Sequence, residues 1–107
     1  MFDESVRAPD DCESIEEVRH AIDQIDQQII NSLGQRFLYV KTITRFKKSE
    51  EDVKAPERYK AVLATRRHWA EENGLDPEMI ETLYRNLIEH FIAIELEDLG
   101  GNNAAQR

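Results

Sequence analysis

Hydrophobic residues recur every three or four positions over a long segment near the start of the chain. From about Glu16 to Lys47 the chain contains no proline, and this spacing predicts an amphipathic α-helix with one apolar face. The apolar positions are Ile15, Val18, Ile22, Ile25, Ile29, Leu33, Phe37, Val40 and Ile43. Two cations, Arg36 and Lys47, fall on the same face of the predicted helix. A buried cation is costly unless an anion meets it.

Two further helices are predicted in the second half of the chain. The second begins at Pro56, which suits a first helical turn, and stops at residues 73–74, which are Asn-Gly. The third begins at Pro77 and ends at the Gly-Gly-Asn-Asn sequence of residues 100–103. The acidic stretch 49–54 has little to bury and is predicted to be a loop. No strand-like alternation competes, so the predicted fold class is all-α with three helices.

The length of the first helix bears on assembly. A chain of 107 residues is large enough for one core but not two, so residues 1–107 are expected to form one domain with irregular ends at 1–13 and 100–107. A helix of about 32 residues is about 48 Å long, whereas a domain of this size has a radius of gyration near 13 Å. We therefore expect an intertwined helical homodimer. The alternative is a monomeric four-helix bundle in which the first helix breaks at Gly34.

Composition limits the classes of partner. The formal net charge is −8, which argues against a general nucleic-acid-binding surface. No apolar run approaches the ~20 residues needed to span a bilayer, so no membrane partner is expected and the expected location is cytoplasmic. The single cysteine, Cys12, and the three histidines show no metal-binding spacing. We therefore expect no metal and no cofactor.

A carboxylate stands on the apolar face of the third predicted helix. Glu95 follows Phe91 by four residues and precedes Leu99 by four, so the three share one face. One explanation is a structural ion pair between Glu95 and Arg36 or Lys47. The other is an internal polar site in which the protonation of Glu95 matters. The pattern of residues leaves both explanations open.

Short segments in order along the chain carry a resemblance to a known family. They are Asp11-Cys12, Val18-Arg19-His20-Ala21-Ile22-Asp23-Gln24-Ile25-Asp26, Arg36 with Tyr39-Val40-Lys41, Phe46-Lys47, Ala55-Pro56-Glu57-Arg58, and Trp69-Ala70-Glu71-Glu72-Asn73-Gly74-Leu75. With these segments the chain resembles the all-α chorismate mutase family, and within it the isochorismate pyruvate lyase branch. The resemblance covers about residues 10–99.

The resemblance implies an intertwined dimer of three-helix chains and a set of site residues for a small dicarboxylate substrate. Arg19 and Arg36 would hold the two carboxylates of the substrate, Lys47 would contact its ether oxygen and a carboxylate, and Arg58 would line the loop side of the site. The family commonly has glutamine where this chain has Glu95. A glutamine donates a hydrogen bond to the ether oxygen at any pH, whereas a glutamate donates only when protonated.

The spacing of Arg19 and Lys47 shows whether one chain could bring both residues to the same ligand. Arg19 precedes Lys47 by 28 residues, or about 42 Å along one straight helix. One small ligand cannot touch both. If both serve one site, Arg19 must come from the partner chain.

The expected activity is conversion of isochorismate to salicylate and pyruvate, with secondary conversion of chorismate to prephenate. Family mutases commonly have a glutamate directly after the arginine that corresponds to Arg58, where it holds the ring hydroxyl of the substrate. This chain has Tyr59 there, which weakens the case for a dedicated mutase and leaves the contact to the ring substituent open. The alternatives are a mutase acting mainly on chorismate or 4-amino-4-deoxychorismate and, from another class, a non-catalytic helical dimer that binds a pathway metabolite.

Overall fold

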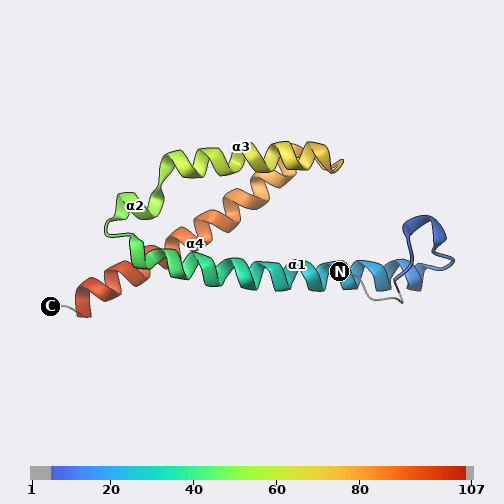
Figure 1. The fold of residues 1–107 in the computed structure, drawn as a ribbon, viewed down its shortest axis with the longest axis horizontal. Coiled ribbons are helices and arrows are strands. Elements are labelled where there is room, and N and C mark those ends of the chain that lie inside the picture. The colour runs from blue at the N-terminus through green and yellow to red at the C-terminus, as the bar shows by residue number, and fades with distance from the viewer. Residues whose placement is uncertain (1–5, 106–107) are drawn as a thin grey trace. The chain divides into compact units, whose positions relative to one another are not determined.

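The computed structural model describes residues 6–105, and all regular structure in that range is helical. The elements in order are η1 (Pro9–Asp11), α1 (Ile15–Ile43), η2 (Thr44–Phe46), α2 (Glu50–Lys54), α3 (Pro56–Glu72) and α4 (Pro77–Ala105). Figure 1 shows three long helices, α1, α3 and α4, with α2 as a short additional one. The prediction of an all-α fold with a long first helix is confirmed.

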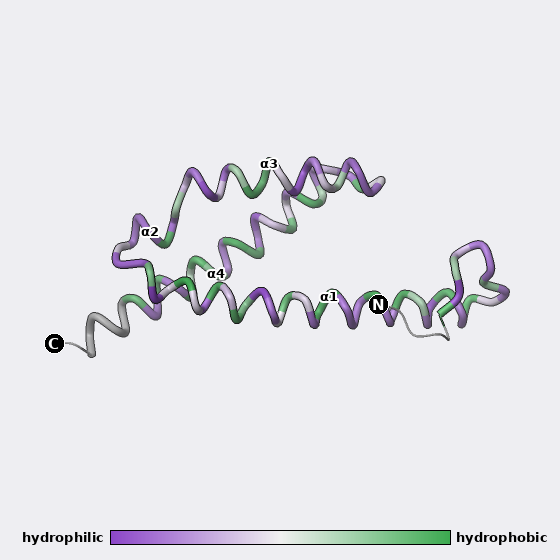
Figure 2. The backbone as a smooth tube through the Cα atoms, in the orientation of Figure 1, coloured by the Kyte–Doolittle hydropathy of each residue, from purple (hydrophilic) through white to green (hydrophobic). Residues whose placement is uncertain are grey.

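The chain divides into two compact units, Met1–Tyr39 and Val40–Arg107. The N-terminal unit contains η1 and most of α1. No residue of α1 is buried, and Figure 2 shows hydrophobic residues recurring along its length. Most of the predicted apolar stripe is therefore exposed on this chain, at Ile15, Val18, Ile22, Ile25, Ile29 and Ile43.

Local hydrogen bonds set the start of α1 where the sequence predicts it. The Ser14 hydroxyl accepts the backbone N–H of Glu17 at 3.2 Å, as an N-cap residue does. The Glu17 carboxylate in turn accepts the N–H of Glu13 at 3.0 Å. The predicted irregular lead-in, 1–13, contains one short turn, η1, and its first five residues lie outside the described range.

The end of α1 differs from the prediction. The α-helix stops at Ile43, tightens into η2, and reaches Lys47 as extended backbone with φ −100° and ψ 130°. Residues 42–44 are Thr-Ile-Thr, and β-branched side chains lower helix propensity. The Thr44 hydroxyl also donates to the Lys41 carbonyl at 2.6 Å, which engages one of the last helical carbonyls. Lys47 is thus not part of the helical face to which the periodicity assigned it.

The stretch predicted as a loop, residues 49–54, contains the helix α2, so that prediction is wrong. The Ser49 hydroxyl accepts the N–H of Asp52 at 3.1 Å, and the Asp52 carboxylate accepts the N–H of Lys48 at 3.1 Å. Reciprocal bonds of this kind cap a helix N-terminus. The stretch also has something to bury, because Val53 is among the most buried residues of the described chain.

Ala55 joins α2 directly to α3. Its backbone is left-handed, with φ 36° and ψ 64°, and its N–H donates to the Glu51 carbonyl at 2.9 Å. A left-handed residue commonly ends a helix, and Pro56 can then open the next because its missing N–H would be unpaired there. This arrangement lets α3 begin immediately where α2 ends.

Helices α3 and α4 form a hairpin that carries the core of the C-terminal unit. The buried apolar residues are Val53 on α2 with Val62, Leu63 and Ala70 on α3. The predicted turn is confirmed, since Asn73 caps α3 and Gly74 follows with a φ of 70°. The start of α4 at Pro77 is confirmed as well, and the Asp76 carboxylate accepts the N–H of Glu78 at 3.0 Å.

The C-terminal end of α4 also differs from the prediction. Residues 100–107 were expected to be irregular, but α4 continues to Ala105, and residues 106–107 lie outside the described range. A glycine lowers helix stability by about 1 kcal/mol relative to alanine without forbidding the helix, so two glycines at 100–101 do not end it. Within the described part of the chain, none of the helices is both long and apolar enough to cross a membrane.

Candidate functional site

A buried ion pair links the segment after α1 to the far half of α4. The ammonium of Lys47 lies 3.2 Å from Oε2 of Glu95, and the two side chains are 19% and 6% exposed. Glu95 is the one buried charged residue among those whose side chains the structure describes. The periodicity predicts Glu95 on an apolar face, with Lys47 or Arg36 as a possible ion-pair partner. In the structure the partner in contact is Lys47.

Backbone contacts fix the position of Lys47. Its N–H donates to the Thr44 carbonyl at 3.2 Å, so the residue is held at the end of η2. Its ammonium donates a second hydrogen bond to the Val53 carbonyl at 3.4 Å, besides the one to Glu95. Because Val53 is buried, the cation lies at the edge of the core of the C-terminal unit. The periodicity of α1 could not predict this, because Lys47 reaches its place as extended chain.

The other predicted site residues are placed as follows. Arg58 is exposed on the first turn of α3, and no contact of its side chain with Lys47 or Glu95 is present in the described chain. Arg19 is exposed and Arg36 is partly buried, both on α1 within the N-terminal unit. The structure thus brings Lys47 and Glu95 together within the C-terminal unit.

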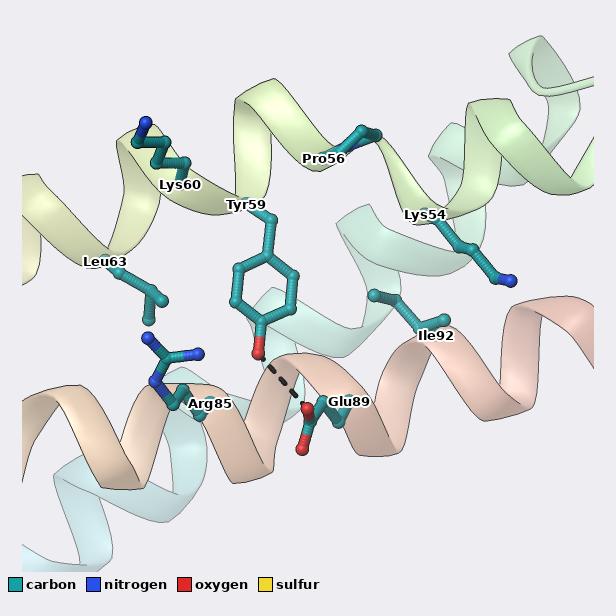
Figure 3. Close-up of a pocket in the computed structure, with 8 residues that line it drawn as sticks. All are labelled: Lys54, Pro56, Tyr59, Lys60, Leu63, Arg85, Glu89 and Ile92. Atoms are coloured by element: carbon teal, nitrogen blue, oxygen red, sulfur yellow. Dashed lines mark hydrogen bonds between the residues drawn. The ribbon is translucent and has the colours of Figure 1, made fainter.

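A second polar group lies between α3 and α4, and Figure 3 shows it. The Tyr59 hydroxyl donates to Oε1 of Glu89 at 3.4 Å, beside Arg85. These residues line a cavity of about 480 Å³ together with Leu63 and Ile92. Tyr59, which the sequence left as an uncertain contact for a ring substituent, therefore has a carboxylate partner on α4.

Arg85 and Glu81 extend this polar group along the surface of α4. The Arg85 guanidinium donates to Oε2 of Glu81 at 3.1 Å, and Arg67 on α3 donates to Oε1 at 3.2 Å. The hydrogen bond from Arg85 lowers the pKa of the Glu81 carboxyl below its usual range. The sequence analysis missed this network, although the spacing of four residues between Glu81, Arg85 and Glu89 is the signal that could have found it.

The described part of the chain thus combines an all-α fold with a buried lysine–glutamate pair. Residues 18–96 of the chain match the family model described as chorismate mutase type II. The match covers well over half of the chain and includes all five predicted site residues. The chain belongs to the chorismate mutase type II family.

A curated relative agrees with this assignment. The isochorismate pyruvate lyase of Pseudomonas aeruginosa is 45% identical to the chain over 92 residues. The alignment covers 86% of this chain and 91% of the relative. The similarity therefore extends over nearly the whole of both proteins.

Proposed function

We propose that this protein converts isochorismate to salicylate and pyruvate, and that it converts chorismate to prephenate as a secondary activity. The observation that carries the proposal is the buried pair of Lys47 and Glu95 in a chain 45% identical to a named isochorismate pyruvate lyase. A lysine and a carboxyl group near the core can act on the ether oxygen of a compact dicarboxylate more strongly than the same groups in water.

The reaction requires no nucleophile from the protein. A ring C–H bond breaks and its hydrogen moves to the enolpyruvyl methylene carbon, while the ether C–O bond breaks. The products are salicylate and pyruvate, and all atoms come from one bound molecule. Catalysis then consists of holding the reactive conformer and stabilising the negative charge that develops on the ether oxygen.

Lys47 is the residue we assign to the ether oxygen. Its ammonium has three N–H donors, and two of them are directed at Glu95 and the Val53 carbonyl. The third donor remains for a substrate oxygen. Anchoring to Val53 and Glu95 fixes the cation before substrate arrives, which is the preorganisation that electrostatic catalysis requires.

Glu95 has two roles in this proposal. As a carboxylate it accepts the hydrogen bond from Lys47 seen in the structure and offsets the charge of the buried cation. When protonated it becomes a donor and can support the same ether oxygen. The second role makes the rate depend on pH.

Arg19 and Arg36 are assigned to binding of the two carboxylates and Arg58 to the loop side of the site, and the spacing of the first two residues favours a second chain. Arg36 follows Arg19 by 17 residues on α1, which corresponds to about 26 Å along the helix. Lys47 lies beyond the end of α1, so helix geometry does not set its distance from Arg19. A small dicarboxylate cannot span the distance between Arg19 and Arg36, so we propose that Arg19 is supplied by the partner chain of a homodimer.

Exposed apolar surface supports the homodimer. The stripe along α1 has no buried residue, and apolar surface of this extent on a helix normally packs against another element. The hairpin of the C-terminal unit also exposes Trp69, Met79 and Leu83, each about half exposed. A second copy of the chain offers a matching apolar surface to both.

Tyr59 favours the lyase as the main activity over a dedicated mutase. Family mutases commonly have a glutamate directly after the arginine that corresponds to Arg58, whereas this chain has Tyr59, whose hydroxyl donates to Glu89. Tyr59 therefore concerns only which of the two reactions is faster, and not the assignment of Lys47 and Glu95.

The test offers isochorismate and chorismate separately to the purified protein and follows salicylate and prephenate. We expect salicylate from isochorismate at a higher kcat/KM than prephenate from chorismate. Prephenate without salicylate at every pH would reverse the order of the two activities. Neither product would remove the enzymatic proposal and leave a non-catalytic metabolite-binding dimer.

A further inference from the structure

Two hydrogen bonds from backbone N–H groups, one of Lys47 and one of the next residue, hold the chain in place at Lys47. On the N-terminal side its N–H donates to the Thr44 carbonyl. On the C-terminal side the N–H of the next residue, Lys48, donates to the Asp52 carboxylate at 3.1 Å. An extended residue between two short helices has little else to fix it, so these two bonds determine where the Lys47 side chain begins.

The bond to Asp52 depends on the cap of α2. This helix has only five residues, too few for its own hydrogen bonds to stabilise it in isolation. Its first turn is closed by the Ser49 hydroxyl, which accepts the N–H of Asp52 at 3.1 Å. Ser49 thereby orients Asp52, and Asp52 in turn binds the N–H of Lys48.

The same helix supplies an acceptor for the Lys47 ammonium. Val53 lies one residue after Asp52, is buried, and accepts a hydrogen bond from Nζ of Lys47 at 3.4 Å. Loss of the cap would therefore disturb both the backbone beside Lys47 and one of the two acceptors at its ammonium. No other exposed carboxylate of α2 has this connection, because Glu50 pairs with Lys54 within the helix at 2.8 Å.

From these contacts we infer that Ser49 and Asp52 are positioning residues for Lys47. The inference rests on the proposed function for its effect on rate, but the placement of Lys47 can be measured without any substrate. Asp52 is exposed and belongs to an acidic stretch that otherwise resembles solvated surface. Its role comes from one backbone hydrogen bond and not from its charge.

The chain offers a matched control in Glu51. It precedes Asp52 in the first turn of α2 and is exposed, and its carboxylate has no hydrogen bond or ion pair in the described chain. Both carboxylates interact favourably with the helix dipole. Asp52→Ala and Glu51→Ala thus remove the same charge, and only the first removes the bond to Lys48. Asp52→Asn removes the charge but keeps an oxygen that accepts an N–H.

The experiment measures acetylation of Lys47 by acetic anhydride in the intact protein, with exposed Lys60 as internal reference and mass spectrometry as readout. We expect Asp52→Ala to raise the Lys47 rate about fivefold, which corresponds to the loss of one hydrogen bond of about 1 kcal/mol. Glu51→Ala and Asp52→Asn should leave it within about twofold of wild type. With isochorismate as substrate, kcat of Asp52→Ala should fall about fivefold, with a smaller change in KM and an unchanged helical circular dichroism spectrum.

The outcomes separate the two proposals. An unchanged Lys47 acetylation rate in Asp52→Ala would overturn the positioning role, even in an active enzyme. Equal increases in Asp52→Ala and Glu51→Ala would overturn it too, because charge and not the hydrogen bond would then be responsible. A wild-type protein inactive on both substrates would contradict the proposed function, while the acetylation rates would still decide whether Asp52 positions Lys47.

Discussion

Two ion pairs, each with its carboxylate on α4, have similar geometry and different surroundings. Nζ of Lys47 lies 3.2 Å from Glu95, and Nε of Arg85 lies 3.1 Å from Glu81. The first pair is 19% and 6% exposed at its side chains, whereas the second is 49% and 27% exposed. The distance between the charged atoms therefore does not distinguish the pairs, and exposure does.

The difference in exposure changes what each pair can do. Water screens the Arg85–Glu81 pair, and surface pairs of this kind contribute little to stability. Lys47 and Glu95 are both largely removed from water, which costs free energy that a hydrophobic pair of the same volume would not. We propose that the chain keeps this costly pair because the site uses it. Substitutions in the two pairs should therefore differ in kind as well as in size.

The largest effect is expected from Lys47→Ala. The variant lacks the cation assigned to the ether oxygen, so salicylate formation should fall by about 10²-fold or more. Lys47 lies outside the helices, so the helical circular dichroism spectrum and the oligomeric mass should be preserved. Steady-state kinetics and light scattering provide the two measurements.

Lys48→Ala is the matched control, because Lys48 is exposed and its side chain makes no contact with Glu95. This variant should keep its activity within about twofold of wild type. If Lys47→Ala unfolds the protein instead, the pair is a structural ion pair and the catalytic assignment is wrong.

A smaller effect, visible mainly as a change in pH dependence, is expected from Glu95→Gln. Protonated Glu95 donates a hydrogen bond and the carboxylate does not, so wild-type kcat should fall as pH rises and the carboxyl group loses its proton. Glutamine donates at every pH, and the profile of the variant should be flatter. A wild-type kcat that stays constant from about pH 5 to about pH 9 would remove Glu95 from the donor role.

The smallest effect is expected from Glu81→Gln in the exposed pair. The hydrogen bond from Arg85 lowers the pKa of Glu81, so its stabilising contribution is present above the usual glutamate pKa and is lost as pH falls through the lowered value. The melting temperature of wild type should therefore decrease slightly more between about pH 6 and about pH 3 than that of the variant. At neutral pH the kcat of the variant should equal that of wild type. A large loss of activity would show that the exposed network contributes to the site.

The sequence predicted the helices well where periodicity and caps agree. The apolar spacing from Ile15 to Ile43 and the prolines at 56 and 77 are local signals, and α1, α3 and α4 begin where these signals lie. The prediction was wrong where short-range hydrogen bonds outweigh composition. Residues 49–54 read as solvated acid, yet Ser49 and Asp52 cap a helix that buries Val53.

The sequence predicted that Glu95 pairs with a cation but not how Lys47 reaches it. Glu95 could be found because a carboxylate breaks an apolar face, and Lys47 because a cation does the same. Their contact depends on Lys47 leaving α1 after η2, and a helical wheel cannot show that. The partner of Tyr59 was missed for a related reason, since its hydrogen bond to Glu89 joins residues 30 positions apart on two helices.

The central claim is that one chain supplies Lys47 and Glu95 and the other supplies Arg19. The most direct test mixes Arg19→Ala and Lys47→Ala proteins, each inactive alone, by unfolding and refolding them together. Random pairing makes half of the dimers mixed, and each mixed dimer has one intact site and one doubly substituted site if the site is shared. We predict recovery of about a quarter of wild-type salicylate formation. Mixed dimers that form, as mass measurements would show, but recover no activity would contradict the claim that the two chains share the site.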